Sequence, residues 1–188
     1  MVSVLNNREL DYRRPVKLLD GSWIMLRPIT CDDKQALLDF HARQSVQTRF
    51  FRYHYSKGEL TNVDLDNFCN IDFWDSYALV AELVTDSRSE IIGVGRFYRL
   101  PTSLHTAEVA FVVQDNEQGK GIGTKLLKYL ANQAWERDIY FFTGEVLREN
   151  GRILSIFTKS DPEMHLTDQD DHTCIVTLSI QEIMNRID

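Results

Sequence analysis

The stretch from Thr106 to Leu127, TAEVAFVVQDNEQGKGIGTKLL, constrains the fold more than any other part of the chain. It begins with alternating and then continuous apolar residues, as in a strand of a buried sheet. Gln118 to Gly123 contain three glycines and predict a tight turn, and Thr124 opens the pattern of an amphipathic helix. Free N–H groups and the positive end of the helix dipole then meet at one point. The sequence therefore predicts a binding site for a phosphorylated ligand.

Two common phosphate motifs do not fit this turn. A P-loop needs two residues, Gly and Lys, at its end, whereas Gly119 and Lys120 stand at the start of the turn. A dinucleotide-binding fingerprint needs a third glycine where Thr124 or Leu126 stands. Both nucleotide motifs are thus excluded by missing residues.

A third motif, Gln-x-x-Gly-x-Gly, is met by Gln118, Gly121 and Gly123. It resembles the acetyl-coenzyme A signature of the GNAT superfamily of N-acetyltransferases, and it follows a strand, as that signature does. The alternative interpretation is an ordinary strand-to-helix turn that binds no ligand.

The composition predicts a globular chain of one domain, residues 1–188, in which residues 1–20 form an arm whose order the pattern leaves open. Apolar residues make up 43% of the chain and charged residues 26%, which are ordinary values. With 21 basic and 28 acidic residues the net charge is −7, which argues against a nucleic-acid partner and favours a cationic substrate.

Three cysteines, Cys31, Cys69 and Cys174, stand far apart without metal-ligand spacing. We therefore expect reduced thiols and no metal site. There is no signal-peptide pattern and no apolar run of about 18 residues, so we expect a cytoplasmic protein without a membrane partner.

Apolar periodicity predicts the remaining elements. Strands are expected over residues 23–29, 77–84, 90–100, 106–113, 139–147 and 173–180, and helices over 30–44, within 45–55 and 61–71, from 124 onward, and over 150–159. This order predicts a mixed α/β fold in which a meander feeds a β-α-β unit, with parallel pairing between the strands that begin at Thr106 and Ile139. The aromatic and basic segment 45–55, with segment 61–71, is a candidate acceptor surface. The helical spacing of Phe50, Phe51, Leu65 and Phe68 nevertheless favours a buried core for these four side chains.

The resemblance extends over nearly the whole chain, which looks most like the acetyltransferase domain of bacterial Pat-type protein lysine acetyltransferases. It implies the GNAT fold: a central mixed twisted sheet with helices on both faces and a splayed parallel strand pair at the acetyl-CoA site. The matching stretches are residues 18–33, 39–45, 49–51, 70–81, 91–97, 107–123 and 144–150.

The same resemblance implies how the cosubstrate acetyl-CoA is held. Its pyrophosphate would lie on the amides of the glycine turn, and amides freed by the splayed strands would bind the pantetheine arm and polarise the thioester carbonyl. Asn150 is either a coenzyme contact or a helix cap. The predicted coenzyme-binding residues are Phe111, Val112, Val113, Gln118, Gly119, Lys120, Gly121, Ile122, Gly123, Thr124 and Asn150.

Glu108 is the predicted general base, because it matches the catalytic glutamate of the lysine-acetylating branch. An ammonium group must lose a proton before its nitrogen can attack a thioester, and a carboxylate can accept that proton directly or through water. The alternative is a solvent-facing strand residue without a catalytic role.

The chain departs from the family at two places. Phe157 stands where many GNAT enzymes have a tyrosine that protonates the leaving thiolate, and Asp161 and Pro162 replace the usual Gly-Phe pair. We therefore expect either departure of the thiolate without a protein donor or the use of another side chain.

Three acceptor hypotheses follow. The first is a protein lysine, the second a small amine such as a polyamine, an amino acid or an aminoglycoside, and the third a non-catalytic acyl-CoA sensor that binds a partner. A deep enclosed pocket would favour a small amine, and an open surface a protein. The sequence leaves the oligomeric state open, with a homodimer as one option.

Overall fold

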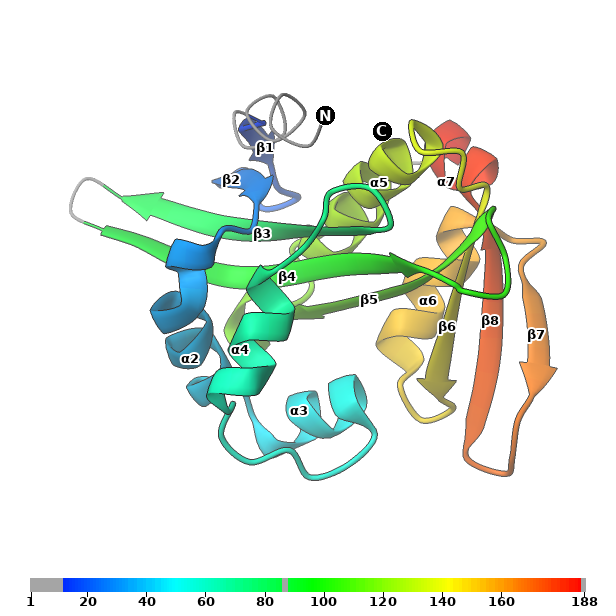
Figure 1. Ribbon diagram of the computed structural model, residues 1–188, viewed down its shortest axis with the longest axis horizontal. Helices are drawn as coiled ribbons and strands as arrows, with labels where there is room; N and C mark the ends of the chain where they lie inside the picture. The colour runs from blue at the N-terminus through cyan, green and yellow to red at the C-terminus, as the bar shows by residue number, and fades with distance from the viewer. Residues whose placement is uncertain (1–11, 86–87, 187–188) are drawn as a thin grey trace.

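The computed structural model describes residues 12–85 and 88–186, and within them the strands form one sheet in the order β1-β2-β3-β4-β5-β6-β8-β7 (Figure 1). The strands are β1 (Arg14–Lys17), β2 (Trp23–Pro28), β3 (Ser76–Thr85), β4 (Arg88–Arg99), β5 (Thr106–Val113), β6 (Phe141–Leu147), β7 (His165–Asp168) and β8 (Thr173–Ser179). The helices are α2 (Lys34–Ala42), α3 (Val46–Tyr53), α4 (Asn62–Cys69), α5 (Ile122–Trp135), α6 (Gly151–Ser160) and α7 (Ile180–Arg186), with the 3₁₀ turns η1 (Cys31–Asp33) and η2 (Asp115–Glu117).

The sheet is antiparallel except between β5 and β6, which run parallel, as the crossover through α5 requires. Their pairing is short, because only Thr106 to Glu108 of β5 lie opposite Phe141 to Thr143 of β6. From Gly144 onward β6 pairs with β8 alone. Figure 1 shows the consequence: β6, β8 and β7 turn away from the long strands β3, β4 and β5. The predicted mixed fold with a splayed parallel pair is therefore confirmed.

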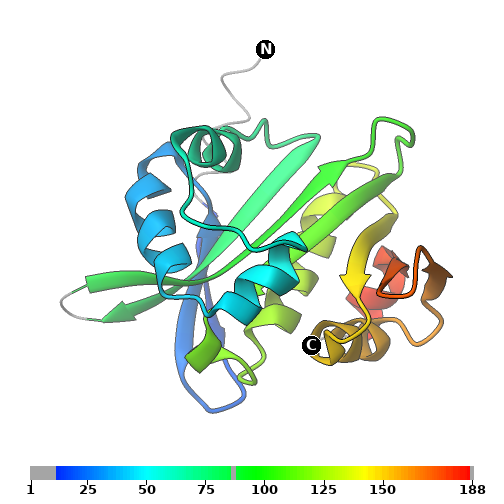
Figure 2. The same ribbon diagram turned by 90° about the horizontal axis from the view of Figure 1, so that it is seen from below.

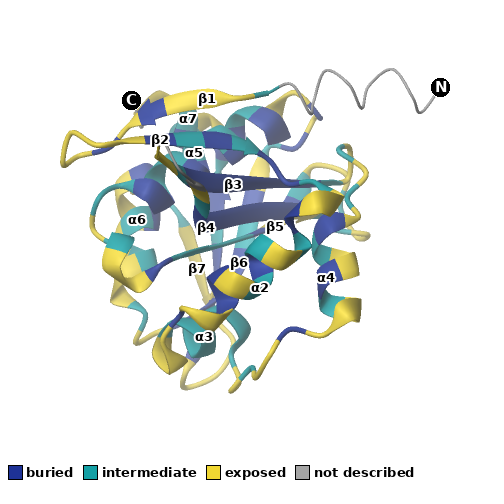
Figure 3. Ribbon diagram, turned by 90° about the vertical axis from the view of Figure 1, so that its left-hand side faces the viewer, coloured by how far each residue is buried: buried dark blue, intermediate teal, exposed yellow. Residues whose placement is uncertain are grey.

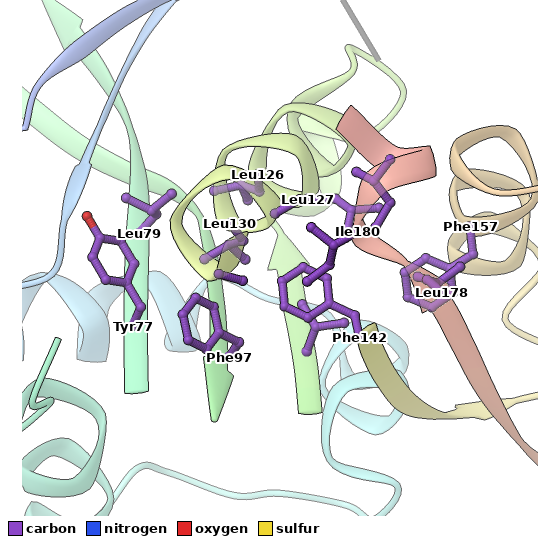
Figure 4. Close-up of a cluster of buried hydrophobic side chains, with 14 of the residues drawn as sticks. Tyr77, Leu79, Phe97, Leu126, Leu127, Leu130, Phe142, Phe157, Leu178 and Ile180 are labelled. Atoms are coloured by element: carbon purple, nitrogen blue, oxygen red, sulfur yellow. The ribbon is translucent and has the colours of Figure 1, made fainter. Parts of the chain in front are cut away.

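Helix α5 packs on one face of the long strands, where two glycines of β4 let it approach closely. A Cβ atom at Gly95 would lie 3.0 Å from Leu130 Cδ1, and one at Gly93 would lie 3.1 Å from Ile122 Cγ2. Figure 4 shows the apolar side chains that α5 contributes to this core, facing those of β3, β4 and β6. Trp135, the last residue of α5, is 40% exposed.

The opposite face of the long strands carries α2, α3 and α4 (Figure 2). A second apolar cluster forms there, around Phe40, Leu65 and Val94. Figure 3 shows the buried central strands β3 and β4 between helices whose surfaces are more exposed. Phe68 packs against this cluster, whereas Phe50 and Phe51 are only half-buried on α3. The core interpretation of segment 45–55 thus holds only in part.

A buried ionic network joins η1 to β2 and β3. The guanidinium of Arg27 donates two hydrogen bonds to Asp33, of 2.7 and 2.8 Å, and one of 2.6 Å to Glu82. Asp33 also accepts a hydrogen bond of 2.7 Å from the backbone of Thr30. Burial alone would raise the pKa of Asp33, but the hydrogen bonds from Arg27 and Thr30 lower it below its ordinary value.

Three elements lie outside the expected pattern. β1 forms within the segment expected as an arm and pairs with β2, while residues 1–11 of that arm lie outside the described residues. β7 pairs with β8 at the edge of the sheet, and α7 follows β8 directly. The predicted strands and longer helices otherwise appear with boundaries shifted by a few residues, and α5 begins at Ile122 rather than Thr124.

Candidate functional site

The glycine turn between β5 and α5 has the conformation that its residues predict. Gly119 has φ = 84° and Gly121 has φ = 93°, both in the left-handed region that side chains disfavour. Gly121 is the N-cap residue of α5, and as a glycine it provides no capping oxygen. The first N–H groups of α5 therefore point out of the helix with the positive end of its dipole behind them, which is an anion-binding arrangement.

Side chains hold this turn against its neighbours. The amide of Gln118 donates a hydrogen bond of 3.0 Å to the carbonyl of Val113, which ties the turn to the end of β5. Arg152 of α6 donates to the amide oxygen of Gln118. Lys120 lies 2.8 Å from Glu117, and its carbonyl accepts a hydrogen bond of 3.1 Å from the backbone of Leu19. The turn thus has a fixed shape rather than that of a loose loop.

The hydrogen-bond register between β4 and β5 determines which backbone amides of β5 face the gap between β5 and β6. Leu100 donates to the carbonyl of Thr106 and Gln114 donates to that of Ile92, so even-numbered residues of β5 direct their backbone groups toward β4. The N–H groups of Phe111 and Val113 therefore face the side of β6, where pairing has already ended. The N–H of Val112 is directed toward β4 instead.

Glu108 lies at the point where the two strands separate. It is opposite Tyr98 on β4 and opposite Thr143 in the last pair between β5 and β6. Its side chain is exposed and lies on the face of the sheet that carries α2 to α4. An exposed carboxylate beside the separating strands can accept a proton from an amine that enters from this face.

The start of α6 lies after the end of β6, and Asn150 caps it. The side-chain oxygen of Asn150 accepts a hydrogen bond of 3.4 Å from the backbone of Ile153, so the capping role is present, and a coenzyme contact stays a prediction. Phe157 of the same helix is 1% exposed, and its ring packs edge-on against Phe111. The departure at Asp161 has a structural role, because its carboxylate accepts a hydrogen bond of 2.8 Å from the backbone of Ser179.

Helix α3 is tied to the segment that leads into the glycine turn. The carboxylate of Asp115 accepts hydrogen bonds of 2.9 and 2.7 Å from the backbone and hydroxyl of Ser45, and one of 2.7 Å from the hydroxyl of Thr48. At the other end of the helix, Nδ1 of His54 lies 3.3 Å from a carboxylate oxygen of Glu145 on β6. One helix of the acceptor face is therefore linked to both separating strands.

Comparison with known families decides what kind of site this is. The family model described as the acetyltransferase (GNAT) domain matches residues 24–161, from β2 to the end of α6. The chain belongs to the GNAT acetyltransferase family. This confirms the resemblance on which the sequence analysis relied, and it places the chain among the acetyltransferases. The glycine turn and both strands of the splayed GNAT pair lie within the matched residues.

Individual relatives agree with this assignment. The GNAT domain of S. lividans PAT has a TM-score of 0.79 and 28% identity to this chain, with 89% of this chain and 96% of that chain covered. The acetyltransferase Pat of Mycolicibacterium smegmatis is 28% identical over 163 residues, which cover 83% of this chain and 48% of the relative. The match thus spans about half the length of that Mycolicibacterium relative.

A more distant structure shares the fold. The yncA protein of Salmonella typhimurium, solved with its cofactor acetyl-CoA, has a TM-score of 0.65 at 16% identity, with 84% of this chain and 94% of that chain covered.

Two further findings, on metal ligands and on membrane-spanning helices, apply to residues 12–85 and 88–186. In this part of the GNAT chain no group of three or more metal-ligating side chains converges, and no helix has the length and apolar character to cross a bilayer.

Sequence reasoning left several residues of the site unassigned. Arg52 and Arg96 lie on the acceptor face beside Glu108, and Asp115 and Glu145 anchor α3. Charged residues of this kind follow no periodic pattern, and only the alternation of β4 could have placed Arg96 on the face of Glu108.

Proposed function

We propose that this GNAT protein transfers the acetyl group of acetyl-CoA to a primary amine, chiefly the side chain of a protein lysine, in the cytoplasm. The observation that carries the proposal is the position of Glu108 at the end of the β5–β6 pairing, beside the amides that the separating strands direct into the gap. Donor and acceptor can then meet at one carbonyl carbon without a covalent enzyme intermediate.

Backbone groups would hold the coenzyme. The turn from Gln118 to Thr124 offers N–H groups to the pyrophosphate, and its two left-handed glycines keep side chains away from that anion. The N–H groups of Phe111 and Val113, which face away from β4, would bind the pantetheine arm. A donor close to the thioester oxygen would stabilise the negative charge that develops there during attack.

Glu108 would accept the proton that the acceptor ammonium loses before its nitrogen attacks the thioester. The carboxylate is exposed to the acceptor face, so it can act directly or through one water molecule. Phe157 provides no hydroxyl to protonate the leaving group, and its ring is buried against Phe111. The coenzyme A thiolate therefore leaves without help from this position and takes its proton from solvent.

The acceptor face favours a protein lysine over a bulky small amine. The cavity that the structure has there, between α2, α3, α4 and the strands β4 and β5, has a volume of about 30 Å³. A pocket for an aminoglycoside or a polyamine needs several hundred Å³. A lysine side chain presented by a protein surface needs only a short channel to Glu108.

The test combines binding and transfer. Calorimetric titration with acetyl-CoA comes first, followed by acetyl transfer to a cell lysate and to a panel of small amines, read by mass spectrometry. We expect saturable coenzyme binding and acetylated lysines in the lysate. Absence of coenzyme binding would overturn the proposal, and binding without transfer to either acceptor set would favour an acyl-CoA sensor instead.

A further inference from the structure

Two arginines share the small cavity on the acceptor face. Arg96 comes from β4 and is 5% exposed, and Arg52 comes from α3, which covers β5. Both line the cavity together with Ala110, the residue of β5 directly opposite Arg96. The cavity therefore lies beside the strand positions that carry the candidate base.

Neither guanidinium forms an ion pair within 4.0 Å with a carboxylate of residues 12–85 and 88–186. Arg96 donates one hydrogen bond of 3.1 Å to the hydroxyl of Tyr98 and stacks over Phe68 at 4.4 Å, and Arg52 stacks over Tyr53 at 5.3 Å. A guanidinium carries five N–H donors, and burying such a cation without a counter-ion is costly; Arg96 is buried, and Arg52 is half-buried. In a chain with 28 acidic residues, two such neighbouring cations are unusual.

The electrostatic surroundings of Arg52 also indicate that a neighbouring anion is lacking. Burial lowers the pKa of Arg52, the charge of Arg96 lowers it further, and Tyr53 and Glu108 offset only part of this effect. One turn earlier on α3, the Nε atom of Arg49 is buried and has no hydrogen-bond partner. Cationic donors on both α3 and β4 are thus at least partly removed from water, and no carboxylate of the described residues pairs with Arg52 or Arg96.

The cavity lies at a definite distance from Glu108 along the sheet. Arg96 and Tyr98 point to the same face of β4, and Tyr98 is directly opposite Glu108. Two strand residues correspond to about 7 Å, so the cationic pair begins roughly one side-chain length from the candidate base. One acceptor molecule can therefore reach both places.

We propose that Arg52 and Arg96 bind a carboxylate of the acceptor while its amine reaches Glu108. This inference rests on the proposed acetyl transfer and deepens it, because it names the chemical class of acceptor: an amine that carries a carboxylate several bonds away. Such an acceptor is either a lysine next to an acidic residue in a protein or a small amino acid with a separated amine.

The size of the cavity agrees with this ligand group. A volume of about 30 Å³ accommodates about two water-sized atoms. The two oxygens of a carboxylate have this size, and the planar guanidinium groups match their geometry. The rest of the acceptor remains outside the cavity, on the exposed surface near Tyr98.

The experiment measures acetyl transfer to matched acceptors that differ only in charge. One arm uses ω-amino acids of increasing length, from glycine to 6-aminohexanoate, each against its amide. The other uses short peptides in which lysine is followed by glutamate or by glutamine. The enzyme variants are Arg52→Gln, Arg52→Lys and Arg96→Gln, with Arg186→Gln on the exposed surface of α7 as the control.

We expect the carboxylate form of the best acceptor to have a kcat/KM at least about tenfold above its amide. Arg52→Gln and Arg96→Gln should each abolish this preference, Arg52→Lys should restore part of it, and Arg186→Gln should leave it unchanged. The arm with the larger preference identifies the source of the carboxylate. Equal rates for acid and amide, or an undiminished preference in Arg52→Gln, would overturn the inference.

A binding measurement separates this inference from the proposed function. With coenzyme A bound, the N-acetylated products and their amides are titrated by calorimetry, and thermal unfolding shows that each variant is folded. Tighter binding of the carboxylate product, lost in Arg52→Gln, would support the anion site even if no transfer occurs. Equal binding of product and amide would overturn the site even if the protein acetylates lysines.

Discussion

Glu108 lies opposite Thr143 in the last residue pair that joins β5 to β6, so the candidate base stands where the parallel strands separate. A residue at this position lies between two neighbouring strands, and the side chain of Glu108 is exposed. The chemistry of the site follows from this geometry more than from the surroundings of the carboxylate, which is exposed.

Replacement of Glu108 by glutamine should lower kcat by about 10²- to 10⁴-fold, because the amide keeps the shape of the side chain but cannot accept a proton. The Kd for acetyl-CoA, measured by calorimetry, should stay within about twofold, since backbone amides hold the coenzyme. Glu136→Gln, at the far end of α5, is the matched control. Wild-type turnover in Glu108→Gln would remove this residue from the mechanism.

Replacement of Gly121 by alanine should weaken coenzyme binding about tenfold. A side chain at φ = 93° costs about 1–2 kcal/mol, and its Cβ would lie 3.1 Å from Leu19 Cγ. Gly151→Ala is the control, because a Cβ atom there would meet no other atom within 4 Å and the backbone lies outside the left-handed region. Equal coenzyme affinity in both variants would contradict the role assigned to the turn.

Replacement of Asp115 by alanine should raise the acceptor KM several-fold and lower the stability by about 2 kcal/mol, because three hydrogen bonds to Ser45 and Thr48 are lost. Steady-state kinetics and urea unfolding measure the two effects. Asp171→Ala, on the exposed loop before β8, should change neither quantity. An unchanged acceptor KM in Asp115→Ala would show that α3 does not depend on this anchor.

Replacement of Asp33 by asparagine should lower the free energy of unfolding by about 3 kcal/mol, since Arg27 loses its bidentate partner in a buried network. The folded pKa of Asp33 lies below its ordinary value of 3.8, so its contribution is present above that pH and is lost as the pH falls through the folded value. Urea unfolding at pH 7 and at pH 3 should therefore show a smaller difference between wild type and Asp33→Asn at the lower pH. A constant difference would contradict this linkage.

The parts of the fold that alternate or repeat were predictable from the sequence. The strand from Thr106 to Val113 and the glycine turn could be recognised because apolar periodicity and left-handed glycines leave a direct trace in the residue order. β7 left no such trace, since its four residues are all exposed and its position depends on pairing with β8. β1 is a comparable edge strand, with a single buried residue at Val16.

The site was predictable where it consists of backbone and less so where it consists of side chains. The amides of the turn follow from the glycine motif, but the approach of Arg52 to Arg96 joins two elements that are distant in sequence. Arginine is usually exposed, so the residue type alone does not identify a buried arginine. Only the tertiary packing distinguishes a buried arginine from an exposed one. The N–H groups of Phe111 and Val113 could be assigned to the gap only from two backbone hydrogen bonds of the structure. No sequence pattern predicts these two hydrogen bonds.

Helix α3 is fastened at its start by Asp115, just after β5, and contacts Glu145 of β6 through His54 at its end. A helix that contacts two separating strands at its two ends responds to a change in the distance between them. Because α3 contacts residues of both strands, the separation of β5 and β6 and the position of Arg52 on α3 are mechanically linked.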